Sequence, residues 1–263
     1  TTEIYTLSLH DALPISSTSL PRSYRKRYAI LIGIDRMQKF DHKLRFSASD
    51  ARAMAAVLRD RFGYECNVLV DEMATMAGIS SAVNELKSTV STNDAVIVYF
   101  AGMGIAIPDP NVHEGTAAVL CPYDFDDSTQ IRTDSLIQQV QSLTAAARLL
   151  ILDVCQSVAG IAESRMVTWN DDSRALVVLG ASAATEYSSE GPKGGVFTSA
   201  LIEELSKLNG ASGDYVSANE IVSQISRTLV STSYRQTPTV IRTSKTADFW
   251  FGGGVGATQD LIH

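Results

Sequence analysis

The chain has 263 residues, of which 45% are hydrophobic and 19% charged, and its formal net charge is −7 at pH 7. This acidic balance gives no support to nucleic-acid binding, which relies on clustered Lys and Arg side chains. Because no stretch approaches about 18 consecutive apolar residues, a membrane span is not expected either. The length and composition fit one globular domain with a sizeable core.

The first residues do not share the pattern of the rest of the chain. TTEIYTLSLHDALPISSTSLP lacks the basic start and continuous apolar core of a signal peptide. It resembles the translation of a sequencing-adapter DNA. We therefore expect residues 1–23 to be a non-native segment or a flexible terminus, residues 24–251 to form one domain, and residues 252–263 to be a tail. His10 carries no functional weight.

From residue 28 onward, short apolar runs alternate with segments of helical periodicity. Runs rich in β-branched and aromatic residues predict strands at YAILIGI, ECNVLVD, DAVIVYF, RLLILD and RALVVLGAS. Apolar spacing and capping residues predict helices at residues 47–63, after Thr75, and at 134–143, 196–208 and 217–229. TPTVIRT and ADFWF are expected to close the chain as a short edge element. This alternation predicts an α/β fold whose mainly parallel, doubly wound sheet has helices on both faces.

The loops after parallel strands meet at one edge of such a sheet, where ligands usually bind. Those loops include AGMGIA, a glycine-flanked turn, and VCQSVAG. No phosphate-binding glycine fingerprint follows the first strand and no GKS or GKT occurs, which disfavours a nucleotide-binding protein. A receiver-like signalling domain needs an acidic pair after the first strand and a Lys after the last. Only Asp35 is placed for it, so this class ranks far behind.

The three cysteines, Cys66, Cys121 and Cys155, are too few and too dispersed for a disulfide framework or a zinc site. A reducing compartment fits best, so we expect a cytoplasmic protein without a bound metal. Cys66 and Cys121 lie in apolar surroundings and are interpreted as inert core residues. Cys155 follows a buried strand that ends at Asp153, a better position for a nucleophile.

Six segments resemble, in the correct order, the caspase and metacaspase family. YAILIGID is similar to the family's first strand, LRFSASDARAMAAVLRDRFGY to its first helix, and AVIVYFAGMG to its Tyr-Phe-Ser-Gly-His-Gly segment. LDVCQS resembles the Asp-x-Cys segment of metacaspases, ASAATEYSSEGPKGGVFTSALIEEL the small-subunit segment, and RQTPTVIR the Gln-x-Pro ending. The resemblance covers almost all of residues 28–251 and implies a caspase-like fold with a six-stranded sheet and a peptide or protein substrate.

One departure from the family concerns catalysis. In caspase-type peptidases the catalytic His lies about 50 residues before the Cys, and here Met103 occupies that position. A cysteine peptidase needs a base to form the thiolate and to protonate the leaving amine, and methionine does neither. Losing one member of a catalytic pair commonly costs about 10⁴–10⁶ in kcat. His42 and His113 lie in loops from which either could supply a substitute base.

Other parts of the site match the family better. The resemblance implies Cys155 as the nucleophile, with its own backbone N–H and that of Gly104 forming the oxyanion hole. Asp153 matches the acidic residue that gives metacaspases their preference for Arg or Lys before the scissile bond. Ser182 matches a polar residue of that pocket, and Asp35 could add a second carboxylate. Asp153 could equally be a capping residue for the loop after its strand.

The remaining signals are weaker. The arginine with which caspases hold an acidic P1 residue has no clean match, because Arg45 is one place off register, so cleavage after Asp is disfavoured. Arg165, in SVAGIAESRMVTWNDDSR, is placed for cleavage by a relative, or belongs to a simple surface loop. DFDDS at residues 124–128 could hold calcium, as some metacaspases do. It lacks an EF-hand pattern, so a solvated loop is favoured and no cofactor is expected.

We interpret the chain as a caspase-like domain without its catalytic histidine, and thus as a pseudopeptidase that regulates or binds. Its partner would be a peptide with a basic residue, or an active relative. The main alternative is a working cysteine endopeptidase that cleaves after Arg or Lys through Cys155. In that case the base comes from elsewhere, or Met103 is a substitution made to trap the protein uncleaved.

Overall fold

The structure is a computed structural model that describes residues 24–41, 43–110, 115–155, 176–183, 186–208, 214–234, 236–243 and 248–252. Its centre is a six-stranded sheet with the strand order β10-β8-β7-β3-β1-β2. Neighbouring strands are parallel, except that β10 runs antiparallel to β8. The strands are β1 Arg27–Gly33, β2 Glu65–Val70, β3 Ala95–Ala101, β7 Ala147–Asp153, β8 Val177–Gly180 and β10 Thr239–Arg242. The predicted fold class is confirmed.

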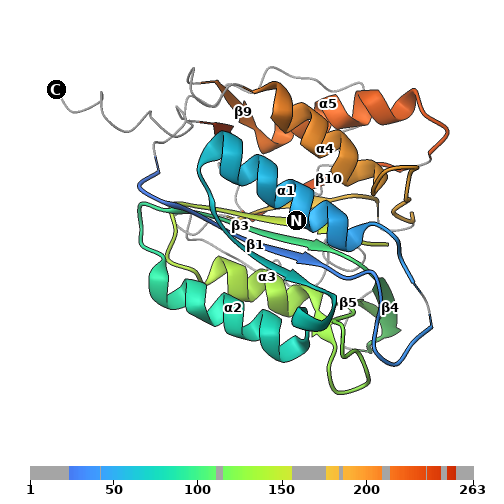
Figure 1. Cartoon of the computed structure of the whole chain (residues 1–263). Coiled ribbons are helices and arrows are strands. Elements are labelled where there is room, and N and C mark those ends of the chain that lie inside the picture. Colours follow the sequence, from blue (N-terminus) through green and yellow to red (C-terminus); the bar gives the residue numbers. More distant parts are fainter. Residues whose placement is uncertain are drawn as a thin grey trace.

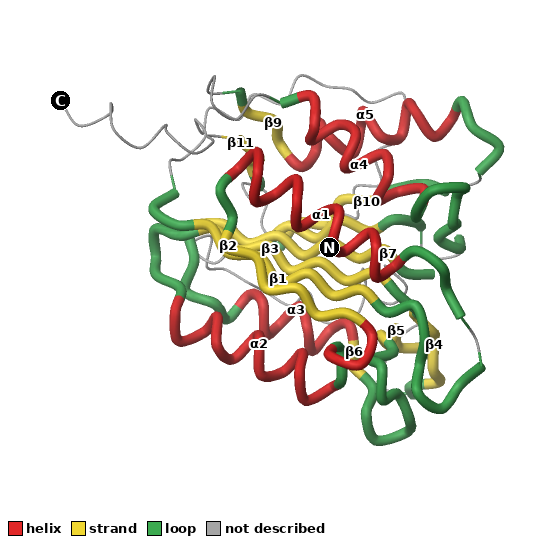
Figure 2. The backbone as a smooth tube through the Cα atoms, in the orientation of Figure 1, coloured by secondary structure: helices red, strands yellow, loops and turns green. Residues whose placement is uncertain are grey.

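Helices cover both faces of this sheet (Figure 1). One face carries α1 (Ser47–Phe62), α4 (Val196–Lys207) and α5 (Ala218–Val230), and the other carries α2 (Met76–Thr89) and α3 (Thr133–Gln141). Figure 2 shows the strands as one layer between the two helical layers. As predicted, Thr75 caps α2, because its hydroxyl accepts a hydrogen bond from the Gly78 N–H at 3.0 Å.

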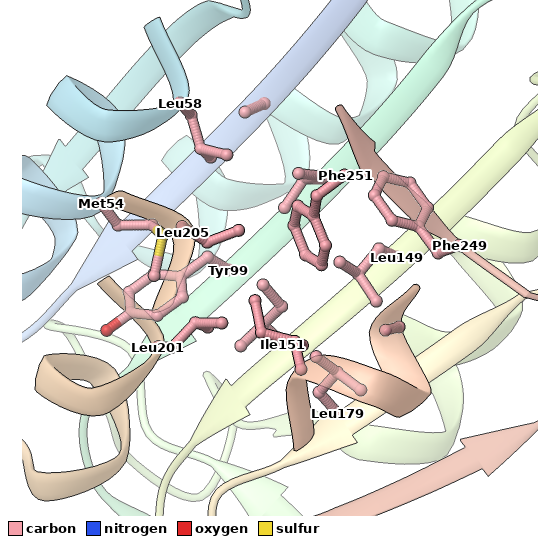
Figure 3. Packing of buried hydrophobic residues seen from close by; sticks show 14 of the residues in the cluster. Met54, Leu58, Tyr99, Leu149, Ile151, Leu179, Leu201, Leu205, Phe249 and Phe251 are labelled. Atoms are coloured by element: carbon pink, nitrogen blue, oxygen red, sulfur yellow. The ribbon is translucent and has the colours of Figure 1, made fainter. Parts of the chain in front are cut away.

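Both faces of the central strands are buried, as their continuous apolar runs predict. β3 is buried along its whole length. Tyr99 belongs to the core that α1, α4 and α5 cover, whereas Phe100 belongs to the core under α2 and α3. Figure 3 shows Met54 of α1 and Leu201 of α4 packed around the Tyr99 ring. The alternation of side chains along each strand therefore joins two hydrophobic cores through one sheet.

A three-stranded antiparallel sheet, which the sequence patterns did not predict, follows β3. It has the order β4-β5-β6 and lies beside the carboxyl end of β3 (Figure 1). Its strands are β4 Gly104–Pro108, β5 Thr116–Leu120 and β6 Ile131–Arg132. GIAIP and TAAVL are short and contain Gly, Pro and Ala, which are poor strand formers, so local propensity gives little sign of this hairpin.

The prediction that TPTVIRT and ADFWF form one edge element is wrong. The first contributes β10 to the edge of the central sheet. The second contributes β11 (Trp250–Gly252), which pairs instead with β9 (Tyr215–Ser217) in a separate two-stranded sheet. Phe249 and Phe251 are buried in the core under α1, so their hydrophobic burial draws this segment away from β10.

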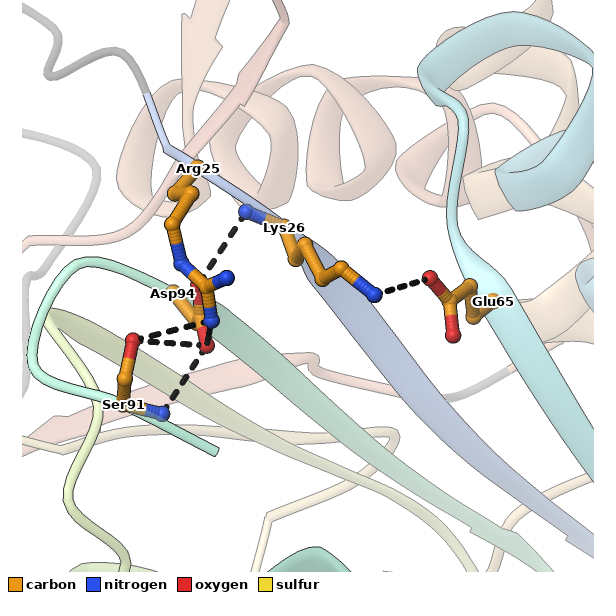
Figure 4. Close-up of polar contacts among 5 residues, drawn as sticks. All are labelled: Arg25, Lys26, Glu65, Ser91 and Asp94. Atoms are coloured by element: carbon orange, nitrogen blue, oxygen red, sulfur yellow. Dashed lines mark hydrogen bonds and ion pairs between the residues drawn. The ribbon is translucent and has the colours of Figure 1, made fainter. Parts of the chain in front are cut away.

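At the amino ends of β1 and β3, the buried carboxylate of Asp94 joins two segments of the chain (Figure 4). It accepts hydrogen bonds from the Arg25 guanidinium at 2.9 and 3.1 Å and from the Lys26 N–H at 3.1 Å. It also accepts bonds from the N–H and hydroxyl of Ser91, both at 2.9 Å. These contacts hold the start of β1 against the turn before β3, at the end of the sheet opposite to the loops that follow β1, β3 and β7.

Within the described ranges, no helix has the length and apolar character needed to cross a membrane. The predicted boundary segments, residues 1–23 and 252–263, lie outside those ranges apart from Gly252, the last residue of β11.

Candidate active site

The register of the central strands brings the predicted site residues together. It aligns the last residues of β1, β3 and β7, which are Gly33, Ala101 and Asp153. Asp35, Met103 and Cys155 each lie two residues beyond those positions. Because parallel strands end at the same edge of the sheet, these three residues follow neighbouring strand ends there.

Cys155 is half-buried at the end of β7. Its Sγ atom lies 3.9 Å from the carbonyl oxygen of Ser188, to which the thiol donates a weak hydrogen bond. Burial raises the pKa of the Cys155 thiol above its ordinary value. The thiol is therefore mostly protonated near neutral pH, and only the protonated thiol can donate to a carbonyl.

Met103 lies between β3 and β4, and Gly104 begins β4 beside Cys155. The carbonyl of Met103 accepts a hydrogen bond from the Cys121 N–H at 3.0 Å, which fixes the backbone at the position of the family's histidine. A Cβ placed on Gly104 would lie 2.9 Å from the carbonyl oxygen of Cys155 and 3.1 Å from the Val154 side chain. Gly104 does not have a left-handed φ, so glycine is required here by the close approach to Cys155 rather than by a sharp turn.

Asp153 is 7% exposed, and hydrogen bonds engage both of its carboxylate oxygens. Oδ1 accepts from the Ser188 hydroxyl, and Oδ2 accepts from the Thr198 hydroxyl at 2.6 Å. Thr198 lies in the first turn of α4 and itself accepts from the buried Tyr99 hydroxyl at 2.8 Å. Burial raises the pKa of Asp153, although these hydrogen bonds oppose the rise. The carboxylate therefore joins the loop after β8 to the first turn of α4. The residues that follow Cys155 lie outside the described ranges, so capping of the loop after β7 stays a prediction.

Asp50 is a site residue that sequence reasoning missed. It lies in the first turn of α1, and its Oδ2 accepts the Gly195 N–H at 2.7 Å. Burial, together with the charges of Asp153, Asp35 and Glu190, raises the pKa of Asp50 to about 7, although the hydrogen bond from Gly195 opposes the rise. The available signal was position: Asp50 is a charged residue on the buried stripe of α1 that also contains Met54.

Asp35 and Glu190 complete an acidic group at the start of α1. Asp35 Oδ1 accepts the Ala48 N–H at 3.0 Å, and burial raises the pKa of Asp35. Glu190 accepts the N–H groups of Arg45 and Phe46 at 2.7 and 3.1 Å. Both side chains therefore cap the N-terminus of α1, where backbone N–H groups lack partners within the helix and the helix dipole favours negative charge.

Arg45 is a surface residue at the rim of this acidic group. Its guanidinium pairs with Glu190 at 3.3 Å and lies over the Phe46 ring, and its side chain is 66% exposed. Because its guanidinium is exposed, Arg45 does not place a buried positive charge beside these carboxylates.

Comparison with known proteins identifies the family. A family model for the caspase domain matches residues 26–250. The chain belongs to the caspase-domain family. Protein GSU0716 from Geobacter sulfurreducens has a similar structure, with a TM-score of 0.66 and 20% identity over 82% of this chain and 93% of that one. Caspase-1 from Spodoptera frugiperda has a TM-score of 0.62 and 15% identity over 83% of this chain and 89% of its own. No curated protein matches significantly.

The solved structures show that this caspase domain has the fold of those proteins. A caspase-like peptidase domain acts on peptide or protein substrates, so the edge that carries Cys155 is the candidate active site.

The remaining predicted residues are distributed as follows. Ser182 follows β8, is fully buried, and donates a hydrogen bond to the Glu186 carbonyl at 3.3 Å. Arg165, as well as His10, His42, His113 and His263, lies outside the described residues. A substitute base and a cleavage site in the 157–174 stretch therefore remain predictions.

In DFDDS, the loop considered for calcium, the carboxylates of Asp124 and Asp126 are engaged by the protein. Asp124 accepts the Met76 N–H at 2.8 Å, and Asp126 accepts hydrogen bonds from Ser128 and Thr129 and pairs with Lys39. In the part of the chain that the structure describes, no group of three or more His, Cys, Asp or Glu side chains is placed to hold a metal.

Proposed function

We propose that this caspase domain recognises a peptide through an Arg or Lys side chain and holds it with little or no cleavage. The observation that carries the proposal is the environment of Cys155. Its thiol has a pKa raised by burial and donates to the Ser188 carbonyl, and the neighbouring strand end carries Met103 instead of a titratable residue. The nucleophile is thus present without a base at the family's position.

The basic preference is supported by the paired carboxylates of Asp50 and Asp153. A Cβ on Gly195 would lie 3.0 Å from Asp50 Oδ2 and 2.8 Å from Asp153 Oδ2, so the two carboxylates approach the same backbone position. Burial raises the pKa of both carboxyl groups, so their ionisation is disfavoured. A guanidinium or ammonium group would relieve this cost, and charge-assisted hydrogen bonds are about twice as strong as neutral ones.

Impaired catalysis follows from chemistry that methionine lacks. General acid–base catalysis contributes about 10²–10⁴ in rate when a group of suitable pKa is positioned at the reacting atoms. Met103 can neither accept a proton from Cys155 nor give one to the leaving amine. Binding through the acidic group needs no proton transfer, so recognition survives where turnover does not. Such a domain would act as a regulatory or peptide-binding module, and its partner could be a substrate of an active relative or that relative itself.

An active cysteine endopeptidase with the same basic preference is the second candidate. The same acidic group supports it, because both candidate functions begin with recognition of an Arg or Lys side chain. Its base would come from His42 or His113, or the methionine would be a substitution that traps an otherwise intact enzyme. The two candidates differ only in turnover, and an assay of turnover separates them.

The test is hydrolysis of a fluorogenic peptide ending in Arg, with a peptide ending in Asp as the specificity control. The unaltered protein, Met103→His and Cys155→Ala are compared, each with calcium and with a chelator. We expect hydrolysis of the Arg peptide by Met103→His alone, at a rate about 10²-fold or more above Cys155→Ala. Turnover by the unaltered protein above the Cys155→Ala blank would establish the active enzyme instead. Cleavage of the Asp peptide in preference to the Arg peptide would refute recognition of a basic side chain by the acidic group.

A further inference from the structure

Gln236 is a buried residue between α5 and β10 whose carboxamide reaches the loop after β8. Its Nε2 donates to the Ala181 carbonyl at 2.9 Å and to the Ser188 hydroxyl at 3.3 Å. Its Oε1 accepts the Ser189 N–H at 3.1 Å. One side chain, 6% exposed, thus uses both donors and its acceptor on a single loop.

The contact with Ser189 sets the direction of a carbonyl group. The Ser188 C=O and the Ser189 N–H belong to one planar trans peptide, in which these two groups point in opposite directions. When Gln236 holds the N–H, the carbonyl is directed to the other side of the peptide. That carbonyl is the hydrogen-bond acceptor of the Cys155 thiol.

The contact with Ser188 sets the direction of a proton. A hydroxyl has one proton to donate, and the Ser188 hydroxyl donates it to Asp153 Oδ1. Gln236 Nε2 donates to the Ser188 Oγ atom, so this oxygen accepts from Gln236 and directs its own proton to Asp153. Asp153 receives a second such chain from the other side, in which Tyr99 donates to Thr198 and Thr198 donates to Oδ2.

The residue after Gln236 supports the same loop by different means. The N–H and hydroxyl of Thr237 donate to the Glu186 carboxylate at 2.6 and 2.9 Å. Gln236 and Thr237 therefore hold the loop on either side of Tyr187, which is 66% exposed. Of the two, Gln236 alone contacts the Ser188–Ser189 peptide among the hydrogen bonds described.

We propose that Gln236 is a positioning residue of the candidate active site: by fixing the Ser188–Ser189 peptide and the Ser188 hydroxyl, it sets the surroundings of Cys155 and the orientation of Asp153. It acts through Ser188 and touches neither a substrate nor the reacting sulfur. The inference deepens the proposed function, because it concerns the same site, but it does not depend on whether that site turns over.

The test measures how fast iodoacetamide alkylates each cysteine of the intact protein, resolved by peptide mass spectrometry. Cys66 and Cys121 serve as internal references, since burial raises their pKa values to about 11 and about 12 and neither contacts the loop after β8 in the hydrogen bonds described. The variants are Gln236→Leu, which removes the carboxamide, and Gln236→Asn, which keeps the carboxamide on a side chain shorter by one methylene. Gln139→Leu, at an exposed position of α3, is the control for the substitution itself.

With Gln236→Leu we expect Cys155 to react about fivefold faster near pH 8, the size of effect that follows from the loss of one ordinary hydrogen bond. Gln236→Asn should act in the same direction and provides the answer if the leucine variant does not fold. Cys66 and Cys121 should stay within about twofold of the unaltered protein, as should all three cysteines in Gln139→Leu. An unchanged Cys155 rate in a folded Gln236 variant would overturn the inference. So would an equal acceleration of all three cysteines, because that pattern reports general loosening of the fold.

Turnover and ligand binding do not enter this measurement. If no Arg peptide binds the protein, the proposed function is wrong. The alkylation rates still test whether Gln236 positions the surroundings of Cys155.

Discussion

Asp50 of α1 and Asp153 of β7 place their carboxylates against the same backbone position, Gly195, which is the N-cap of α4. Each is held by a separate contact, Asp50 by the Gly195 N–H and Asp153 by the Thr198 hydroxyl. Two acidic groups in a mostly buried space repel each other and lose hydration, so neither ionises easily. Helix N-termini compensate in part, since α1 and α4 both begin here. A bound cation would therefore stabilise the ionised forms of both carboxyl groups.

Asp50 lowers the stability of the unliganded protein at neutral pH. Its pKa is about 7 in the folded protein against an ordinary value of 3.8. The folded state therefore binds more protons than the unfolded state between those values, and the free energy of unfolding falls as pH rises from about 4 to about 7. Asp50→Asn keeps an acceptor for the Gly195 N–H but removes the charge. We expect it to raise the free energy of unfolding by about 2–4 kcal/mol above pH 7.

Urea unfolding of the unaltered protein and of Asp50→Asn at a series of pH values measures this effect. The two proteins should converge near pH 4 and separate as pH rises. Asp60→Asn, on the exposed side of the same helix, is the matched control and should follow the unaltered protein. A destabilised Asp50→Asn above pH 7 would mean that Asp50 is ionised and favourably paired in the folded state.

The same carboxylate predicts how the binding of a basic probe depends on pH. A cation such as benzamidine binds the ionised form of Asp50, so binding competes with protonation of a group whose pKa is about 7. We expect the dissociation constant to rise about tenfold between pH 8 and pH 6 and to change little above pH 8. Asp153, whose pKa burial also raises, makes the dependence steeper.

Isothermal titration calorimetry with benzamidine over this pH range provides the measurement. The variant Asp50→Asn should bind more weakly at pH 8 and lose the pH dependence attributed to Asp50. A dissociation constant that is the same at pH 6 and pH 8 would argue that the probe binds elsewhere.

Gly104 is predicted to be intolerant of even one added methyl group. A Cβ there would lie 2.9 Å from the backbone carbonyl of Cys155, which cannot move without displacing the nucleophile. Gly104→Ala should cost about 1–3 kcal/mol of stability, the range seen for overpacking. Gly191→Ala is the matched control, because the nearest atoms to its added Cβ lie at 3.4 and 3.6 Å, ordinary van der Waals contact.

Thermal unfolding of both alanine variants compares them directly, and alkylation of Cys155 reports on the site. Gly104→Ala should unfold at the lower temperature and alter the Cys155 rate. Equal stability of the two variants would show that β4 can move away from Cys155 at little cost.

Much of the architecture was predictable because local sequence and the sheet agree. The apolar runs of β1, β3 and β7 are buried on both faces, and their lengths fix which residues reach the edge of the sheet. Cys155 and Met103 could therefore be placed at neighbouring strand ends from the sequence and its resemblance to the caspase family. The hairpin β4–β5 could not, since its strands are short and rely on pairing with each other rather than on propensity.

The site was less predictable because its contacts join distant segments. Asp50 meets Gly195 across 145 residues, and Gln236 meets Ser188 across 48. Nothing in the spacing of such residues identifies the pair before the fold is known. Asp35, named from its position after the first strand, belongs to the acidic group but also caps α1, a role that only the geometry reveals. The functions assigned to Cys155, Gly104, Ser182 and Arg165 stay predictions.

Glu190 offers a last prediction, because its charge acts on Asp50. Glu190 is among the groups that raise the pKa of Asp50, while its Oε1 accepts the Arg45 and Phe46 N–H groups. In Glu190→Gln the amide oxygen can still cap α1, but the negative charge is gone. The pKa of Asp50 should therefore fall, so the pH at which benzamidine binding weakens should move to lower pH. Binding above pH 8 should weaken at the same time, since the cation loses one attractive charge. Calorimetry across the pH range measures both effects, and Glu203→Gln, at an exposed position of α4, is the control. A midpoint that moves upward, or an affinity that improves at high pH, would place Glu190 outside the electrostatic group that binds the probe.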